Sequence, residues 1–196
     1  MKKIIFAALF LLFLTGCTAN EAVKAKPAVR NTFACTAKIE TGELKAEAVI
    51  ERFEDGRWSI EFSEPKTLSG VRLDFSEDEV KASYKGLEFS IPKDALPLKA
   101  SLSTMFDVLD KLIAAGEMDG KAEDEQIIVE GETEKGGYIL KFDNSTYELL
   151  AFELPALELK VSFGKFNESV PTETSTSETV TETSVSSEAV PETVGS

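Results

Sequence analysis

The sequence predicts a mainly β domain with one inserted helix: a strongly curved antiparallel sheet of about ten strands, forming an incomplete barrel, with a helical lid. Apolar and polar residues alternate along most of residues 31–166, which is typical of strands with one buried face. Residues 101–115 instead repeat apolar side chains every three or four positions, which indicates a helix. Because antiparallel strands in a meander twist and curl, about ten of them predict a concave apolar face.

The predicted strands follow one another in short hairpins. Trp58, Ile60 and Phe62, for example, alternate with polar residues. Turn signals such as Asp55-Gly56 and Lys85-Gly86 separate neighbouring strands. The strands are predicted over residues 33–40, 43–50, 57–62, 71–75, 80–84, 87–91, 126–131, 138–142, 148–154 and 157–163.

The predicted helix is the element available to cover the concave face. Ser101 or Ser103 can cap its first turn, and Gly116 follows its last residue. We expect its apolar stripe to belong to the core. If the helix packs incompletely on the sheet, the same residues would also contact a bound acyl chain, and the helix would act as a lid. The stripe consists of Leu102, Met105, Phe106, Leu109, Leu112 and Ile113.

The start of the chain has the three parts of a bacterial lipoprotein signal. Lys2 and Lys3 precede the apolar run Ile4–Leu14, which is shorter than the about 20 residues of a bilayer span. The run ends in Leu14-Thr15-Gly16-Cys17, which resembles the lipobox of bacterial lipoproteins. The resemblance implies a diacylglyceryl group on Cys17, cleavage before it, and a chain anchored on the outer side of a membrane. The alternative is an ordinary secretion signal with an incidental cysteine.

The composition divides the chain into four regions. We expect a signal peptide over residues 1–16, the lipidated Cys17 with a tether over 17–30, the sheet domain over 31–166, and a disordered tail over 167–196. The tail is rich in Ser, Thr and Glu and lacks Lys, Arg and aromatic residues, so it cannot bury enough apolar surface to offset its ordering entropy. A solvated tail is the plain interpretation, with O-glycosylation or threading into the cell wall as alternatives.

Several functional classes are disfavoured by the composition. With 35 acidic and 21 basic residues the net charge is −14, which disfavours nucleic acid as a partner. The sequence has no histidine, no Gly-x-Ser-x-Gly turn and no phosphate-binding glycine loop. The acidic residues of 117–125 lack EF-hand spacing and predict a solvated loop. We therefore expect a monomer that is not an enzyme and that uses no cofactor and no metal.

Six strands, one helix and four strands behind a lipobox resemble the LolA/LppX-type lipoprotein-localisation fold. Residues 56–65 (GRWSIEFSEP) followed by Leu68-Ser69-Gly70 are similar to a strand and turn of that family. The resemblance covers residues 31–166 and implies a helical lid over a cavity that binds acyl chains. A soluble carrier of the family holds its lid shut with a buried arginine, and the resemblance selects none of Arg52, Arg57 and Arg72 for that role. An anchored chain is closer to the family's lipid-binding lipoproteins.

The candidate ligand contacts are side chains predicted to face inward. Ala46 and Ala48 leave room either for the helix or for a guest. Cys35 is expected to be a small core residue, and Trp58 a core residue that can also form a cavity wall. The predicted cavity-lining residues are Phe33, Ile39, Ala46, Ala48, Trp58, Ile60, Phe62, Leu73, Phe75, Met105 and Leu109.

We expect from these features a membrane-anchored extracytoplasmic lipoprotein that binds a lipid or acyl chains in its concave face. The alternative is a non-enzymatic envelope protein with a solidly packed core, which presents its acidic face or its tail to a partner.

Overall fold

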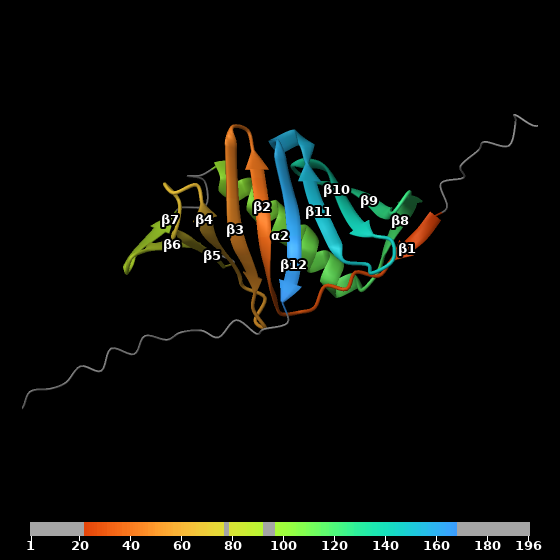
Figure 1. The fold of residues 1–196 in the computed structure, drawn as a ribbon, viewed down its shortest axis with the longest axis horizontal. Helices are drawn as coiled ribbons and strands as arrows, with labels where there is room; N and C mark the ends of the chain where they lie inside the picture. Colours follow the sequence, from red (N-terminus) through yellow and green to blue (C-terminus); the bar gives the residue numbers. More distant parts are fainter. Residues whose placement is uncertain (1–21, 77–78, 92–96, 168–196) are drawn as a thin grey trace, which may run out of the picture.

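The computed structural model describes residues 22–76, 79–91 and 97–167 (Figure 1). The predicted signal peptide, Cys17 and the tail after Asn167 lie outside these residues. The elements in chain order are β1 (Ala22–Ala25), β2 (Phe33–Thr41), β3 (Leu44–Arg52), β4 (Trp58–Glu64), β5 (Arg72–Phe75), β6 (Val80–Tyr84), β7 (Leu87–Ile91), α2 (Pro97–Ala115), β8 (Met118–Glu123), β9 (Gln126–Thr133), β10 (Gly136–Asp143), β11 (Leu149–Leu154), the 3₁₀ helix η2 (Pro155–Leu157) and β12 (Leu159–Asn167).

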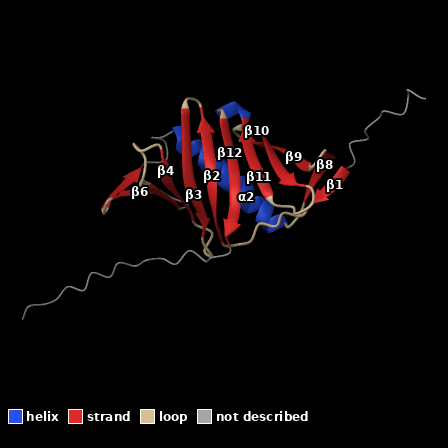
Figure 2. Cartoon of the chain, in the orientation of Figure 1, coloured by secondary structure: helices blue, strands red, loops and turns tan. Residues whose placement is uncertain are grey.

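The strands form one antiparallel sheet in the order β1-β8-β9-β10-β11-β12-β2-β3-β4-β5-β6-β7. Pairing of β12 with β2 joins the last of the described strands to one of the first, in the middle of the sheet. The sheet is open, with β1 and β7 at its edges. Since α2 connects strands from opposite ends of the sheet, it crosses the concave face, and the strands curve around it (Figures 1 and 2).

This architecture confirms the predicted fold class and is the one that the LolA/LppX resemblance implies. The sheet has twelve strands rather than about ten. The two additional strands are β1, inside the predicted tether, and β8, inside the predicted acidic loop. These two strands pair with each other, and Lys24 and Asp119 form an ion pair 2.6 Å long across them. The helix also begins four residues earlier than predicted, at Pro97.

One hydrophobic core fills the space between the sheet and α2. The alternate side chains of the central strands are buried, as the sequence predicts. The predicted stripe of α2 is buried as well, apart from the half-buried Ile113. The ring of Phe106 stacks on Trp58 with centroids 4.5 Å apart and meets the edge of Phe75 at 4.9 Å. Helix and sheet therefore share an aromatic contact at the β4–β5 end of the core.

Cys35 is a buried core residue, as predicted, and its burial gives a testable result. Desolvation raises the pKa of its thiol from 9.0 to about 12. In the unfolded chain this thiol ionises from about pH 9, whereas in the folded chain it stays protonated. The stability that the buried neutral thiol contributes is therefore complete below pH 9 and is lost as the pH rises towards 12.

We expect Cys35 to resist a thiol reagent at pH 8 in the folded chain, with Cys17 blocked by its lipid, and to react fully when the chain is unfolded in urea. Fast labelling of the folded chain would contradict the burial of Cys35.

Candidate functional site

Helix α2 is bound to the sheet by a polar contact at Asp110. The Arg52 Nε donates to Asp110 Oδ1 at 2.8 Å, and the Trp58 indole Nε1 donates to Oδ2 at 3.1 Å. Arg52 and Trp58 are cross-strand partners in β3 and β4, so they lie side by side on the concave face. The guanidinium lies 5.6 Å from the Trp58 ring centroid and also donates to the backbone carbonyl of Asn31. The Arg52 side chain is 12% exposed and that of Asp110 is 40% exposed, so the pair is shielded on the sheet side only.

A groove of about 730 Å³ opens beside this contact, between α2, the β3–β4 turn and the strands β4–β6. Its walls include the apolar side chains of Trp58, Phe75, Val80 and Phe106. Charged side chains of both signs also line it: Asp55, Arg57, Asp107, Asp110 and Lys135. An aromatic floor with charged surroundings is a suitable surface for an amphiphile, which has an apolar part and a polar end.

Asp107, an exposed residue of α2, lines the groove one turn before Asp110. Burial raises the pKa of the Asp107 carboxyl, and the neighbouring charge of Asp110 adds to this rise, while the ammonium of Lys111 opposes it. The carboxylate of Asp107 is therefore somewhat less favoured than a fully solvated one. A guest group that donates a hydrogen bond or carries positive charge would stabilise it.

The predicted cavity-lining residues are all buried, but they do not surround one space. Trp58 and Phe75 line the groove. Phe33 lines a separate pocket of about 220 Å³ formed with β12, and Ala48 lies under a depression of about 350 Å³ on the convex side. The remaining seven belong to the core cluster that α2 shares with the sheet: Ile39, Ala46, Ile60, Phe62, Leu73, Met105 and Leu109. Their role as ligand contacts stays a prediction.

Sequence reasoning missed the polar half of this site. Asp107 and Asp110 are one turn apart on α2, beside the apolar stripe, and their position next to Leu109 and Phe106 is the signal that could have identified them. The sequence predicts Val80 in a strand but does not place it at the site. It predicts Phe106 in the helix stripe but not the contact of its ring with Trp58.

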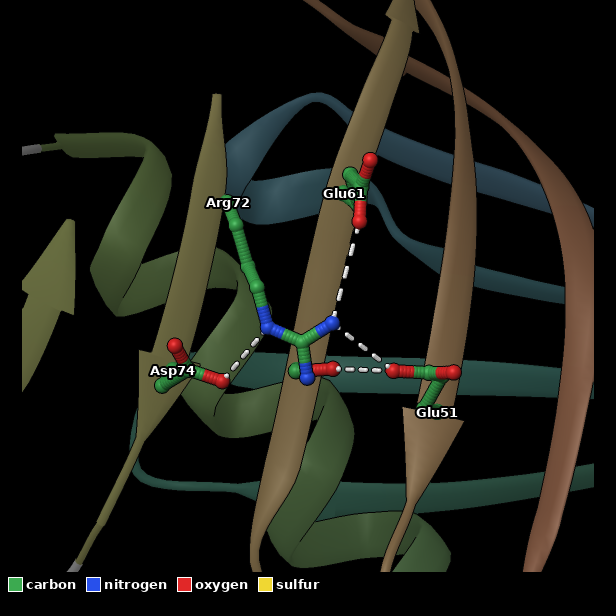
Figure 3. A network of polar contacts seen from close by, with 5 residues as sticks. Glu51, Glu61, Arg72 and Asp74 are labelled. Atoms are coloured by element: carbon green, nitrogen blue, oxygen red, sulfur yellow. Dashed lines mark hydrogen bonds and ion pairs between the residues drawn. The ribbon is translucent and has the colours of Figure 1, made fainter. Parts of the chain in front are cut away.

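The three arginines that the sequence left undecided lie in different places. Arg57 lies in the β3–β4 turn and pairs with Asp55. Arg72 lies on the convex face, where Glu51 and Asp74 are each 3.0 Å away and Glu61 is 3.7 Å away (Figure 3). Arg52 is the one that joins the sheet to α2, through its ion pair with Asp110.

Residues 1–18 match the family model described as a prokaryotic membrane lipoprotein lipid attachment site. The chain is a lipid-anchored membrane lipoprotein. The matched residues include the predicted lipobox at Cys17. Within the part of the lipoprotein that the structure describes, no helix combines the length and the apolar character needed to cross a membrane.

The lipoprotein is also similar to two solved structures. An uncharacterized conserved protein from Thermus thermophilus aligns with a TM-score of 0.44 and 14% identity, over 73% of this chain and 82% of that protein. A LolA superfamily protein from Nitrosomonas europaea aligns with a TM-score of 0.35 and 7% identity, over 72% of this chain and 88% of that protein. No curated protein matches the lipoprotein.

Proposed function

We propose that the lipoprotein, as a monomer without catalytic activity, binds a lipid or other acyl-chain amphiphile in the groove between α2 and β4–β6. The observation that carries the proposal is the groove of about 730 Å³ floored by Trp58, Phe75 and Phe106. Its size falls in the range of about 300–1,000 Å³ that small-molecule sites occupy. The acyl part would lie on the aromatic floor, and the polar end would lie among the charged side chains.

Helix α2 would act as the lid of this site. The groove follows α2 from Ala100 to Asp110, so displacement of this part of the helix would extend the groove towards the core. Opening exposes apolar surface at a cost of about 25 cal/mol per Å². A ligand that covers this surface with its own hydrocarbon offsets the cost, which favours long apolar chains over small polar molecules.

Trp58 provides the test, because it is the only tryptophan of the chain and lies on the floor of the groove. A fatty acid or phospholipid with brominated acyl chains is titrated into the full chain in detergent-free buffer. We expect saturable quenching of the Trp58 emission. Absence of quenching at any concentration, with the chain folded, would contradict the proposal and favour the packed envelope scaffold.

A pair of helix variants gives this titration its control. Ala100→Phe places a ring at the lining of the groove, and we expect it to weaken quenching. Ala114→Phe adds the same ring at an exposed position of α2 and should leave quenching unchanged. Equal titration curves for the two variants would show that the bromine atoms reach Trp58 from outside the groove.

A further inference from the structure

The β6–β7 hairpin carries a cluster of exposed apolar side chains. Three of the five large apolar side chains exposed among the described residues lie on it: Tyr84 is 38% exposed, Leu87 60% and Phe89 56%. The pairs Tyr84–Leu87, Ala82–Phe89 and Val80–Ile91 put these side chains on one face. Val80 is buried in the core, so this face is the concave one. The apolar lining of the sheet therefore continues past the groove onto a surface that no described element covers.

The charges of the hairpin differ from those of the rest of the chain. Residues 80–91 contain Lys81, Lys85 and Glu88, a net charge of 2 − 1 = +1, in a chain of net charge −14. Lys81 pairs with Glu79 at the base of the hairpin. Lys85 lies in the turn, with its Nζ 5.1 Å from the Tyr84 ring centroid. Aromatic and aliphatic side chains beside a lysine are the combination that binds the headgroup region of a bilayer.

The lipid attachment site keeps such a surface close to a bilayer. Only five peptide units separate Cys17 from Ala22, the first residue of β1, and they span at most about 18 Å. β1 and β7 are the two edges of the sheet, and the hairpin lies at the end opposite β1 (Figure 1). Anchoring at one edge raises the effective concentration of the membrane at the other, so a weak contact suffices.

We propose that the face formed by Tyr84, Leu87 and Phe89 docks into the interface of the bilayer that holds the lipid anchor. Lys85 would lie among the lipid phosphates, and Leu87 and Phe89 would enter the acyl boundary. The docked hairpin would fix the orientation of the sheet on the membrane. Because Val80 belongs to the hairpin and also lines the groove, it would join the membrane surface to the groove.

The test uses the full lipidated chain in phosphatidylcholine vesicles with brominated acyl chains. In the variant Phe89→Trp, the added emission should shift to the blue and be largely quenched. The control Val49→Trp places a tryptophan at a position that is 37% exposed on the convex side of β3, and its added emission should stay unquenched. Both are compared with the parent chain, in which Trp58 is the only tryptophan.

The readouts separate docking from binding in the groove. Lipid held in the groove quenches Trp58 in the parent chain, whereas docking quenches the tryptophan at position 89 whether or not Trp58 responds. Equal quenching at positions 89 and 49, or none at position 89, would overturn the docking proposal. A blue shift at position 89 without quenching, together with a cross-linked dimer, would overturn it in favour of contact between two copies.

Discussion

Replacement of Leu109 by alanine is expected to lower the free energy of unfolding by about 2–5 kcal/mol. Leu109 is fully buried in the cluster that joins α2 to the sheet. Alanine preserves the helix, so the loss comes from the removed methyl groups and the cavity that they leave. Since a domain is typically stable by about 5–15 kcal/mol, this single change would remove a large share of the total. Urea unfolding followed by Trp58 emission measures it.

Lys111 provides the control on the same helix. It is exposed two residues further on, and Lys111→Ala should change the free energy of unfolding by no more than about 0.5 kcal/mol. Equal effects of the two substitutions would contradict the packing of Leu109 between α2 and the sheet. They would also contradict the role of α2 as a lid.

The variant Asp110→Asn is expected to loosen α2 from the sheet. Asparagine has one acceptor oxygen for the two donors, Arg52 Nε and Trp58 Nε1, so one of them loses its partner. We expect the free energy of unfolding to fall by about 1–2 kcal/mol, in the lower part of the range for charged hydrogen bonds because Asp110 is partly exposed. Because a loosened lid costs less to open, quenching of Trp58 by a brominated amphiphile should begin at lower concentration than in the parent.

Asp107→Asn is the matched substitution one turn earlier. It removes an exposed carboxylate from the same groove, and partial desolvation raises the pKa of this carboxyl. We expect stability to stay unchanged or to rise slightly, in contrast to Asp110→Asn. Equal losses in both variants would show that Asp110 does not hold the helix, and that negative charge in the groove is what matters.

The elements predicted correctly are those whose hydrophobic pattern is strong. In β2 and β4 buried apolar side chains alternate with mostly polar ones, and α2 has an apolar stripe, so local periodicity determines their type. In β1 and β8 the inward positions include Gly120 and Ala122, whose small side chains give little contrast with their charged neighbours. These two strands form because the crossing of α2 brings their backbones together. The pairing joins residues that are far apart in the sequence, so the local hydrophobic pattern does not predict it.

The residues that line the groove were also predictable only in part from the sequence. The sequence places Trp58 and Phe75 on an inward face, and both line the groove. It does not place Asp110 against Arg52, because these residues are 58 positions apart and their meeting depends on where α2 crosses the sheet. The inward residues nearer the middle of the sheet are covered by the helix.

The sequence by itself determined the attachment signal, the acidic charge, the one-sided strands and the single amphipathic helix, because each depends on residues that are neighbours along the chain. Only the tertiary structure decided the order of the strands, the Arg52–Asp110–Trp58 contact, and which apolar side chains stay uncovered. The physical reason is that open space and exposed apolar surface arise where one helix is too small to cover a twelve-stranded sheet, and that mismatch exists only after the chain has folded.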